Sequence, residues 1–393
     1  MTNRDLFFRH IAQTSPAPIA IEVKKAEGSI ITDGEGKKYI DCIAGISVCN
    51  IGHRHPKVIK AIKKQLDQYL HVLVYGELIE SPQVAFATLL ASQLPPYLNA
   101  VYFTNSGTEA TEGAMKLAKR YTGRPEIVAF HKSYHGSTQG ALSVMGDEHW
   151  RSAFRPLLPG ITHCPYNDYD SLKLITTKTA CVIAEPVQAE AGVIVPAKEW
   201  MQALRDRCTI TATLLIFDEI QTAFGRTGTL WGFEKFGVAP DVLLLGKALG
   251  GGMPLGAFIA SRSVMECLSS DPVLGHITTF GGHPVSCAAG LAALKVLLKK
   301  KVPDTVQSKE DLFLKLLSHE KILNIRSQGL LIALEFESAA IAKVVVEKCI
   351  QKGVLTDWFL FAPECIRIAP PLTITEKEIT SACQLIVQAI DEL

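Results

Sequence analysis

The sequence predicts an α/β fold in which helices cover a mostly parallel central sheet, with a smaller α+β domain beside it. Between about residues 100 and 260, short apolar segments alternate with segments of helical spacing. Runs such as LLIF (214–217) and VLLL (242–245) are continuously apolar, which is typical of parallel strands buried on both faces. The length of 393 residues exceeds the size at which one hydrophobic core stops growing, so two domains are expected.

The first fifty residues are expected to form an irregular arm and short strands that belong to the smaller domain. Segment 28–45 has β-favouring residues on both sides of an Asp-Gly-Glu-Gly sequence at 33–36, which predicts a hairpin. Apolar residues recur at helical spacing in 55–72. This helix opens the large domain, which we assign to residues 51–290.

The large domain is expected to contain the parallel sheet. Helices are predicted at 108–121 and around 198–208. The expected strands lie within these segments: 100–105, 126–130, 180–187, 214–220, 241–249 and 255–261.

Residues 291–393 are expected to form the C-terminal part of the smaller domain. A long helix over 286–301 leads into it, strands are predicted within 323–337 and 365–374, and helices over 339–353 and 375–393. Thr375 and Glu378 have the spacing of a capping box, which predicts where the last helix begins.

Composition excludes several classes of protein. Forty Lys and Arg residues balance 39 Asp and Glu residues, so no charge excess indicates nucleic acid or an anionic membrane as a partner. The ten cysteines show no C-x-x-C spacing, which favours a reducing compartment. No apolar run has the length of a membrane span or the pattern of a leader peptide. We therefore expect a cytoplasmic protein.

Two residues that follow buried strands carry the first chemical signal. Asp218 ends the strand LLIFD, at the edge where open α/β sheets bind ligands. Lys247 follows VLLLG and precedes a glycine run. An apolar surrounding lowers the pKa of a lysine and frees its amine for imine formation. Taken alone, Asp218 could equally bind Mg²⁺ or cap a helix, and Lys247 could be a solvated residue at a strand end.

Two further segments supply an anion site and an aromatic face. The turn Ser106-Gly107-Thr108 opens a helix, so its N–H groups could bind a phosphate, although a capped helix explains the same residues. Tyr134, next to His135, could stack on a cofactor ring. The two His pairs in HKSYHG and GHRHP lack further ligands, so no metal site is predicted.

The four features are more informative together than alone, because of the order in which they occur along the chain. A phosphate turn, an aromatic residue, a strand-end aspartate and a lysine 29 positions later (247 − 218) follow one another. These are the groups that a protein supplies to pyridoxal 5′-phosphate. Neither phosphate-loop fingerprint of nucleotide-binding enzymes occurs.

The sequence resembles the class III (ω-)aminotransferase family, which has the fold type I of pyridoxal-phosphate-dependent transferases. Within the family it is most similar to the acetylornithine and ornithine aminotransferase branch. The resemblance covers essentially the whole chain, and Ala223 and Thr111 stand where glycine and asparagine are usual. The matching segments, in the family's order, are 33–62, SGTEATEGAMKLA (106–118), YHG (134–136), EPVQAEAGV (185–193), DEIQTAFGRTG (218–228), LLGKALGGGMPLGA (244–257) and TTFGGHP (278–284).

The resemblance implies roles for individual residues of the cofactor site. Lys247 would form the Schiff base, and Asp218 would keep the pyridine nitrogen protonated. Gln221 would bind near the phenolic oxygen. Tyr134 would stack on the ring, and the residues that would hold the phosphate or flank the ring are Ser106, Gly107, Thr108 and His135. Thr279 would reach the cofactor of a neighbouring subunit, which implies a homodimer.

The resemblance also implies how two substrates are bound. Arg367 would bind the α-carboxylate of glutamate or 2-oxoglutarate as a bidentate fork. Glu190 would pair with that arginine while an ω-amine is bound. Ser137 departs from the pattern, because the branch usually has arginine there to bind a substrate carboxylate. The amino donor is therefore acetylornithine- or ornithine-like, or a different ω-amine such as diaminobutyrate or 4-aminobutyrate.

Other functions on the same fold stay open at this point. An aminomutase, racemase or decarboxylase would keep the cofactor but would not need 2-oxoglutarate. A non-catalytic ligand-binding protein would be expected to lack Lys247 or Asp218, and both are present. The residues therefore favour a two-substrate transaminase.

Overall fold

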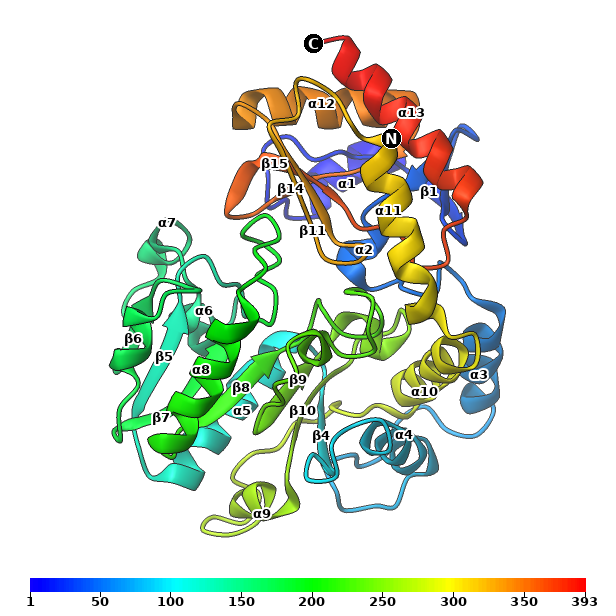
Figure 1. The fold of residues 1–393 in the computed structure, drawn as a ribbon. Helices are drawn as coiled ribbons and strands as arrows, with labels where there is room; N and C mark the ends of the chain where they lie inside the picture. Colours follow the sequence, from blue (N-terminus) through cyan, green and yellow to red (C-terminus); the bar gives the residue numbers. More distant parts are fainter.

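The computed structural model describes residues 1–393, and its large lobe is built on one seven-stranded sheet (Figure 1). The strand order is β4-β10-β9-β8-β7-β5-β6, and only β10 runs antiparallel to its neighbours. This confirms the predicted α/β fold with a mostly parallel sheet. The strands are β4 (Ala100–Thr104), β5 (Glu126–Phe130), β6 (Ile161–Cys164), β7 (Thr179–Ala184), β8 (Leu214–Asp218), β9 (Val242–Leu245) and β10 (Gly256–Ala260).

Helices cover both faces of this sheet. On β8, Leu215 and Phe217 belong to the same core as α8, whereas Leu214 and Ile216 pack with α5. Successive strand residues point to opposite faces, so the continuous apolar run LLIF is explained by burial on both sides. The helices of this lobe are α3 (Pro56–Leu66), α4 (Ser81–Ala91), α5 (Gly107–Thr122), α6 (Gln139–Val144), α7 (Glu148–Arg151), α8 (Lys198–Ile210), α9 (Arg262–Met265) and α10 (Pro284–Lys299).

The smaller lobe contains two four-stranded sheets. In one of them β3 pairs in parallel with β13, which joins the N-terminal strands to the C-terminal part of the chain. The first sheet has the strand order β1 (Val23–Glu27), β2 (Ile30–Asp33), β3 (Lys38–Asp41) and β13 (Val354–Leu355), and the second has the order β11 (Asn324–Ser327), β12 (Ile332–Glu335), β15 (Ala362–Ile368) and β14 (Trp358–Phe359). The helices of this lobe are α1 (Asn3–His10), α2 (Ala44–Ser47), α11 (Val306–Leu316), α12 (Ala339–Lys352) and α13 (Glu376–Asp391).

Local signals in the sequence correspond to observed element boundaries. The turn at 33–36 connects the antiparallel strands β2 and β3. At the start of α13 the Thr375 hydroxyl accepts from the Glu378 N–H at 3.3 Å, and the Glu378 carboxylate accepts from the Thr375 N–H at 2.8 Å. Both N-terminal donors are thereby satisfied. The helices α4 and α11 were not predicted from the sequence.

The expected division at residues 290 and 291 falls inside α10. This helix is buried along most of its length and packs against α3 and α4 of the large lobe. The sequence of this helix is apolar nearly all round, which is typical of a buried helix. We therefore propose that the large domain extends through Lys299.

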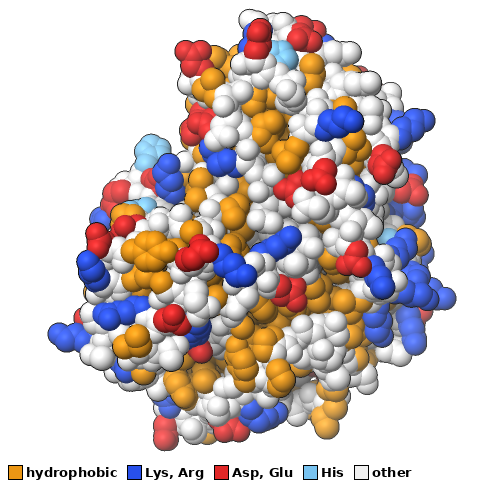
Figure 2. Space-filling view, viewed as in Figure 1, with side chains coloured by type: hydrophobic (Ala, Val, Ile, Leu, Met, Phe, Trp, Pro, Cys, Tyr) orange, Lys and Arg blue, Asp and Glu red, His pale blue; other side chains and the backbone are white.

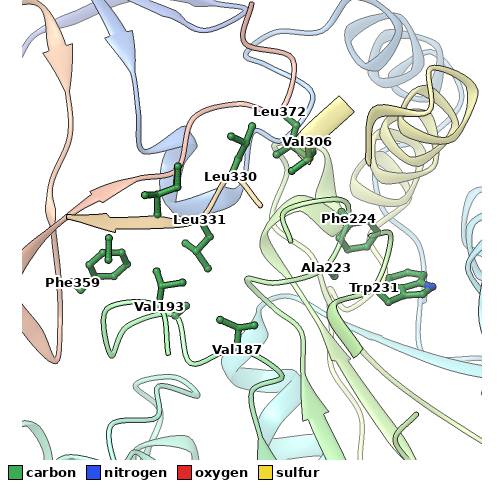
Figure 3. Close-up of a cluster of buried hydrophobic side chains, with 14 of the residues drawn as sticks. Val187, Val193, Ala223, Phe224, Trp231, Val306, Leu330, Leu331, Phe359 and Leu372 are labelled. Atoms are coloured by element: carbon green, nitrogen blue, oxygen red, sulfur yellow. The ribbon is translucent and has the colours of Figure 1, made fainter. Parts of the chain in front are cut away.

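One apolar core passes through both lobes. Figure 3 shows Val187 and Val193 of the large lobe on the side of Leu331 and Phe359 of the smaller one, within a single cluster of 71 buried residues. Figure 2 shows acidic and basic side chains intermixed over one face, with basic ones gathered along its right-hand edge. None of the helices combines the length and the apolar character that crossing a bilayer requires.

A buried arginine ties the lobes together. Arg226 follows β8, and its Nη1 donates to the carbonyls of Leu330 and Pro370, both at 2.7 Å. Its Nη2 donates to Asn50 Oδ1 at 2.6 Å. Three segments far apart in sequence therefore meet on one guanidinium.

Candidate active site

Asp218 and His135 form a buried pair at the carboxyl end of the sheet. Asp218 is the last residue of β8, and His135 lies in the loop after β5. Asp218 Oδ2 lies 2.7 Å from His135 Nδ1, and the two side chains are 4% and 0% exposed. Burial alone would lower the pKa of His135, but the bond to Asp218 and its charge raise it above the usual value. The sequence predicted both residues but not this contact.

Lys247 lies beside them, directly after β9. Its Nζ donates to Gln221 Oε1 at 2.7 Å. The residue adopts a left-handed conformation with φ of 46°, which is uncommon for a residue other than glycine and is found in strained functional turns. Burial lowers the pKa of Lys247, although the carboxylates of Glu190 and Asp218 act in the opposite direction. An amine with a lowered pKa is the form that attacks a carbonyl.

The N-terminus of α5 faces the same pocket. Gly107 and Thr108 line it, and Thr108 Oγ1 lies 2.7 Å from Thr138 Oγ1. A Cβ added at Gly107 would meet Ile220, and one added at Gly136 would meet Thr108. These glycines keep the backbone close around the helix start, so its N–H groups are available to an anion.

Tyr134 is held at the pocket wall by a residue that the sequence analysis did not single out. Glu185, directly after β7, accepts from the Tyr134 N–H at 3.1 Å and from the Ala189 N–H at 3.0 Å. Burial raises the pKa of Glu185 to about 7. The Tyr134 hydroxyl lies 3.1 Å from Ser137 Oγ. Glu185 ends an apolar strand as Asp218 does, so the same sequence signal could have identified it.

Arg367, Glu190 and Asp357 form a second buried cluster. Nη1 and Nη2 of Arg367 donate to Glu190 Oε1 and Oε2 at 2.8 and 3.0 Å, and Nε donates to Asp357 Oδ1 at 2.9 Å. Its guanidinium lies 4.6 Å from the centre of the Phe359 ring. Burial opposes ionisation of Glu190, yet Arg367 holds the pKa of Glu190 below its usual value. No sequence signal indicated Asp357 or Phe359.

Asp218, His135 and Lys247 of the first cluster and Glu190 of the second border one pocket. Two buried nitrogens at this site, His135 Nε2 and Gln221 Nε2, have no hydrogen-bond partner. Buried polar atoms of this kind usually have partners, so their open positions indicate a bound polar molecule. A carboxylate, an amine, an anion cradle and an aromatic face around this space fit pyridoxal 5′-phosphate. The pocket is lined by Gly107, Thr108, Tyr134, His135, Gly136, Ser137, Glu185, Glu190, Asp218, Ile220, Gln221, Thr222 and Lys247.

Two residues predicted for the cofactor site lie outside this lining. The Ser106 hydroxyl accepts from the Glu109 N–H at 3.3 Å and so caps α5. Thr279 is exposed in the segment between α9 and α10 and does not border the pocket. No group of three or more His, Cys, Asp or Glu side chains is arranged to hold a metal ion.

The chain is similar in sequence and in fold to known aminotransferases. Residues 11–390 match the family described as aminotransferase class-III. Acetylornithine aminotransferase of Methanopyrus kandleri is 40% identical over 93% of this chain and 92% of its own length. Putrescine aminotransferase of Pectobacterium atrosepticum is 38% identical over 91% of this chain and 80% of its own. The structure of Toxoplasma gondii ornithine aminotransferase with partial occupancy of PLP is 30% identical, with a TM-score of 0.91 over 99% of this chain and 94% of the other.

Proposed function

Because the chain belongs to the class III aminotransferase family, we propose that this transaminase moves an amino group from an ω-amino donor, of the acetylornithine or ornithine kind, to 2-oxoglutarate. The second product is then glutamate. The observation that carries this proposal is the bidentate pair of Arg367 and Glu190 beside Lys247. A guanidinium that can pair with an internal carboxylate serves two substrates of different charge in one site.

Pyridoxal 5′-phosphate, when bound, supplies a ring that accepts the electron pair released as the substrate carbon loses its proton. Lys247 would hold the cofactor and then move that proton, because its half-buried Nζ lies in the pocket and burial lowers its pKa. Asp218, oriented by His135, would keep the proton on the ring nitrogen. Tyr134 would cover the ring, and Gly107 and Thr108 would hold the phosphate.

Arg367 would act on the substrate end of the reaction. When an ω-amine is bound, Glu190 neutralises the guanidinium, as the bonds at 2.8 and 3.0 Å allow. When glutamate or 2-oxoglutarate is bound, the α-carboxylate would take the place of Glu190. Asp357 accepts from Arg367 Nε and would keep the guanidinium in place while the substrate carboxylate replaces Glu190.

The proposal is tested by supplying the two substrates separately. Purified enzyme with pyridoxal 5′-phosphate should form glutamate only when an ω-amine and 2-oxoglutarate are both present. Amine turnover without 2-oxoglutarate would indicate an aminomutase or decarboxylase instead. The Lys247→Ala variant should lose the absorbance band of the lysine-bound cofactor, and its turnover rate should fall by about 10⁴-fold or more. Steady turnover by that variant would contradict the role of Lys247.

We also infer a homodimer in which Thr279 reaches the cofactor of a second copy. Thr279 lies in an exposed loop, and its neighbours Ile277 and Phe280 are 50% and 53% exposed. Apolar side chains gathered in this way favour contact with another protein surface. Sedimentation velocity of the wild type should show a dimer, and Phe280→Glu should shift it toward monomer with loss of activity. A wild-type protein that stays monomeric while fully active would contradict the inference.

A further inference from the structure

Three polar side chains form a stripe along one face of α5. Thr108, Thr111 and Glu112 have the i, i+3, i+4 spacing that places side chains on the same side of a helix. All three bond to the segment between β5 and the first turn of α6, which also carries Tyr134 and His135. The proposed function gives a role to Thr108 and none to the other two.

Glu112 holds the far end of this segment through a single carboxylate oxygen. Its Oε1 accepts from the Thr138 hydroxyl at 2.6 Å and from the N–H groups of Gly140 and Ala141 at 2.8 and 3.1 Å. Thr138 is the N-cap residue of α6, yet its own side chain makes no capping bond. Glu112 therefore caps α6 from a neighbouring helix, because it satisfies two of the donors at the start of that helix.

Thr111 holds the same segment nearer the cofactor pocket. Its hydroxyl lies 2.9 Å from the His135 carbonyl and 3.2 Å from the Gly107 carbonyl. A hydroxyl has one proton to donate, and the His135 carbonyl is the closer acceptor. His135 in turn bonds to Asp218 at 2.7 Å. The helix that begins at the phosphate turn therefore also fixes the segment whose histidine orients Asp218.

Two glycines let this segment lie directly on α5. A Cβ added at Gly136 would overlap Thr108, and a Cβ added at Gly140 would overlap the Glu112 carboxylate. Gly136 also has a φ of 128°, which glycine adopts without strain. The stripe and the segment are therefore in close contact from Gly136 to Gly140.

The same hydrogen bonds fix the direction of the Thr108 hydroxyl proton. A carboxylate only accepts, so the Thr138 hydroxyl donates its one proton to Glu112. The Thr108 hydroxyl must then be the donor to Thr138 Oγ1, 2.7 Å away. Thr108 Oγ1 also accepts from the Thr138 N–H at 3.3 Å. The Thr108 hydroxyl has no second proton, so Thr108 can donate to an anion only through its backbone N–H.

We propose that Glu112 is a positioning residue for the cofactor, which locks the segment after β5 onto α5 and turns the Thr108 hydroxyl away from the phosphate. The inference rests on the proposed function, because it assumes that pyridoxal 5′-phosphate binds in this pocket. Glu112 and Thr138 do not line the pocket. Glu112 therefore acts on the cofactor through the residues that it holds and not by contact.

The first test compares two substitutions of Glu112 by cofactor binding. Glu112→Gln keeps an oxygen that can accept the same three bonds, so Kd for pyridoxal 5′-phosphate should stay within about threefold of the wild type. Glu112→Ala removes the acceptor and should raise Kd by about tenfold or more, equivalent to about 1.4 kcal/mol. Fluorescence titration of the apoenzyme measures Kd, and circular dichroism checks that both variants fold.

A second readout separates positioning from stability. The pH at which the absorbance band of the lysine-bound cofactor changes depends on the charges and hydrogen bonds around the ring. This pH midpoint should move in Glu112→Ala and should match the wild type in Glu112→Gln. Urea denaturation of the same proteins gives their stability. If Glu112→Ala loses stability but keeps the wild-type Kd and pH midpoint, its role is structural only and the inference is wrong.

Thr108→Val tests the direction of the hydroxyl proton. Valine keeps the shape and the backbone N–H of threonine but has no hydroxyl. Inorganic phosphate competes with the cofactor for the apoenzyme, and its inhibition constant should rise by less than about threefold in this variant. A hydroxyl that donated to the phosphate would form a hydrogen bond to a charged acceptor, and its loss would weaken binding by about tenfold or more. A loss of that size would overturn the inferred proton direction.

The outcomes distinguish this inference from the proposed function. If the wild type binds neither pyridoxal 5′-phosphate nor inorganic phosphate, the proposed cofactor site is wrong and the inference fails with it. If the wild type binds the cofactor and forms glutamate, and both Glu112 variants bind the cofactor as tightly as the wild type, only the inference is wrong.

Discussion

The two ends of the active site are built in different ways. At the cofactor end, Asp218 ends a strand of the large sheet and His135 and Lys247 lie after strands of the same sheet, and their side chains are held by short hydrogen bonds within that lobe. At the substrate end, Glu190 of the large lobe meets Arg367 of β15 in the smaller lobe. In the proposed function, the end that would hold the cofactor is built on one sheet, whereas the end that would accept two substrates lies between the lobes.

The ends also differ in how completely their polar atoms are paired. The cofactor end leaves His135 Nε2 and Gln221 Nε2 without partners, so a bound molecule completes it. The Arg367 guanidinium is bonded at Nε, Nη1 and Nη2, so an incoming carboxylate must displace Glu190. Substitutions at the cofactor end should therefore change kcat for every substrate, and substitutions at the substrate end should discriminate between substrates.

The largest effect is expected at the cofactor end, from Asp218→Asn. The amide cannot hold a proton on the ring nitrogen and weakens the contact with His135, so kcat should fall about 10²- to 10⁴-fold for both half-reactions. Stopped-flow measurement with glutamate and with an ω-amine checks this. A loss confined to one substrate would show that Asp218 belongs to substrate binding instead.

Arg367→Lys should have the next largest effect, and on one substrate only. Lysine keeps the charge but cannot form the fork that spans both oxygens of a carboxylate. We expect KM for glutamate to rise about 10- to 100-fold, equivalent to about 1.4–2.7 kcal/mol. KM for the ω-amine should change by less than about threefold, because the amine does not bind the fork. Equal increases for both substrates would contradict the division between the two ends.

Glu190→Gln should produce the opposite discrimination on a smaller scale. Without its carboxylate, Arg367 is left with Asp357 alone and is more available to glutamate. The ω-amine would then face an excess positive charge, so its kcat/KM should fall by about tenfold. KM for glutamate should stay constant or decrease. A rise in KM for glutamate would mean that Glu190 positions Arg367 more than it neutralises it.

The smallest effect concerns Glu185 and pH. Burial raises its pKa from 4.5 to about 7, so between these values the native protein holds a proton that the unfolded chain has released. This residue therefore stabilises the fold less as pH rises from about 4.5 to 7. The wild type should lose about 1–3 kcal/mol relative to Glu185→Gln over that range. Urea denaturation of both proteins at pH 5 and pH 8 measures the difference, and parallel pH dependences would contradict the assignment.

The sequence was informative where local patterns determine structure. Continuous apolar runs identified β8 and β9, and the residues that follow them, Asp218 and Lys247, face the same pocket. This worked because parallel strands end at one edge of a sheet, so strand order alone brings their last residues together. Tyr134, Gln221 and Glu190 also border the pocket. Tyr134 was proposed from its aromatic ring, whereas Gln221 and Glu190 came from the family resemblance.

Contacts between distant segments could not be predicted in this way. Asp357 reaches Arg367 because β14 pairs antiparallel with β15, with Trp358 opposite Ile366, so that the residue before β14 lies beside Arg367. No periodicity in the sequence encodes that pairing. The boundary expected at 290 lies inside α10, because a buried helix has no polar face in its sequence to indicate which lobe it packs against. Ser106 was expected either in the cofactor site or as a helix cap, and in the structure its hydroxyl caps α5.

Arg226 has a consequence for how the protein unfolds. Its guanidinium joins the segment after β8 to Leu330, Pro370 and Asn50, so neither lobe can detach without exposing carbonyls that have lost their donor. Such orphaned groups are costly, and the two lobes should therefore melt in one calorimetric transition. Amides near Arg226 and in β15 should exchange with deuterium at matching rates, as members of one cooperative unit.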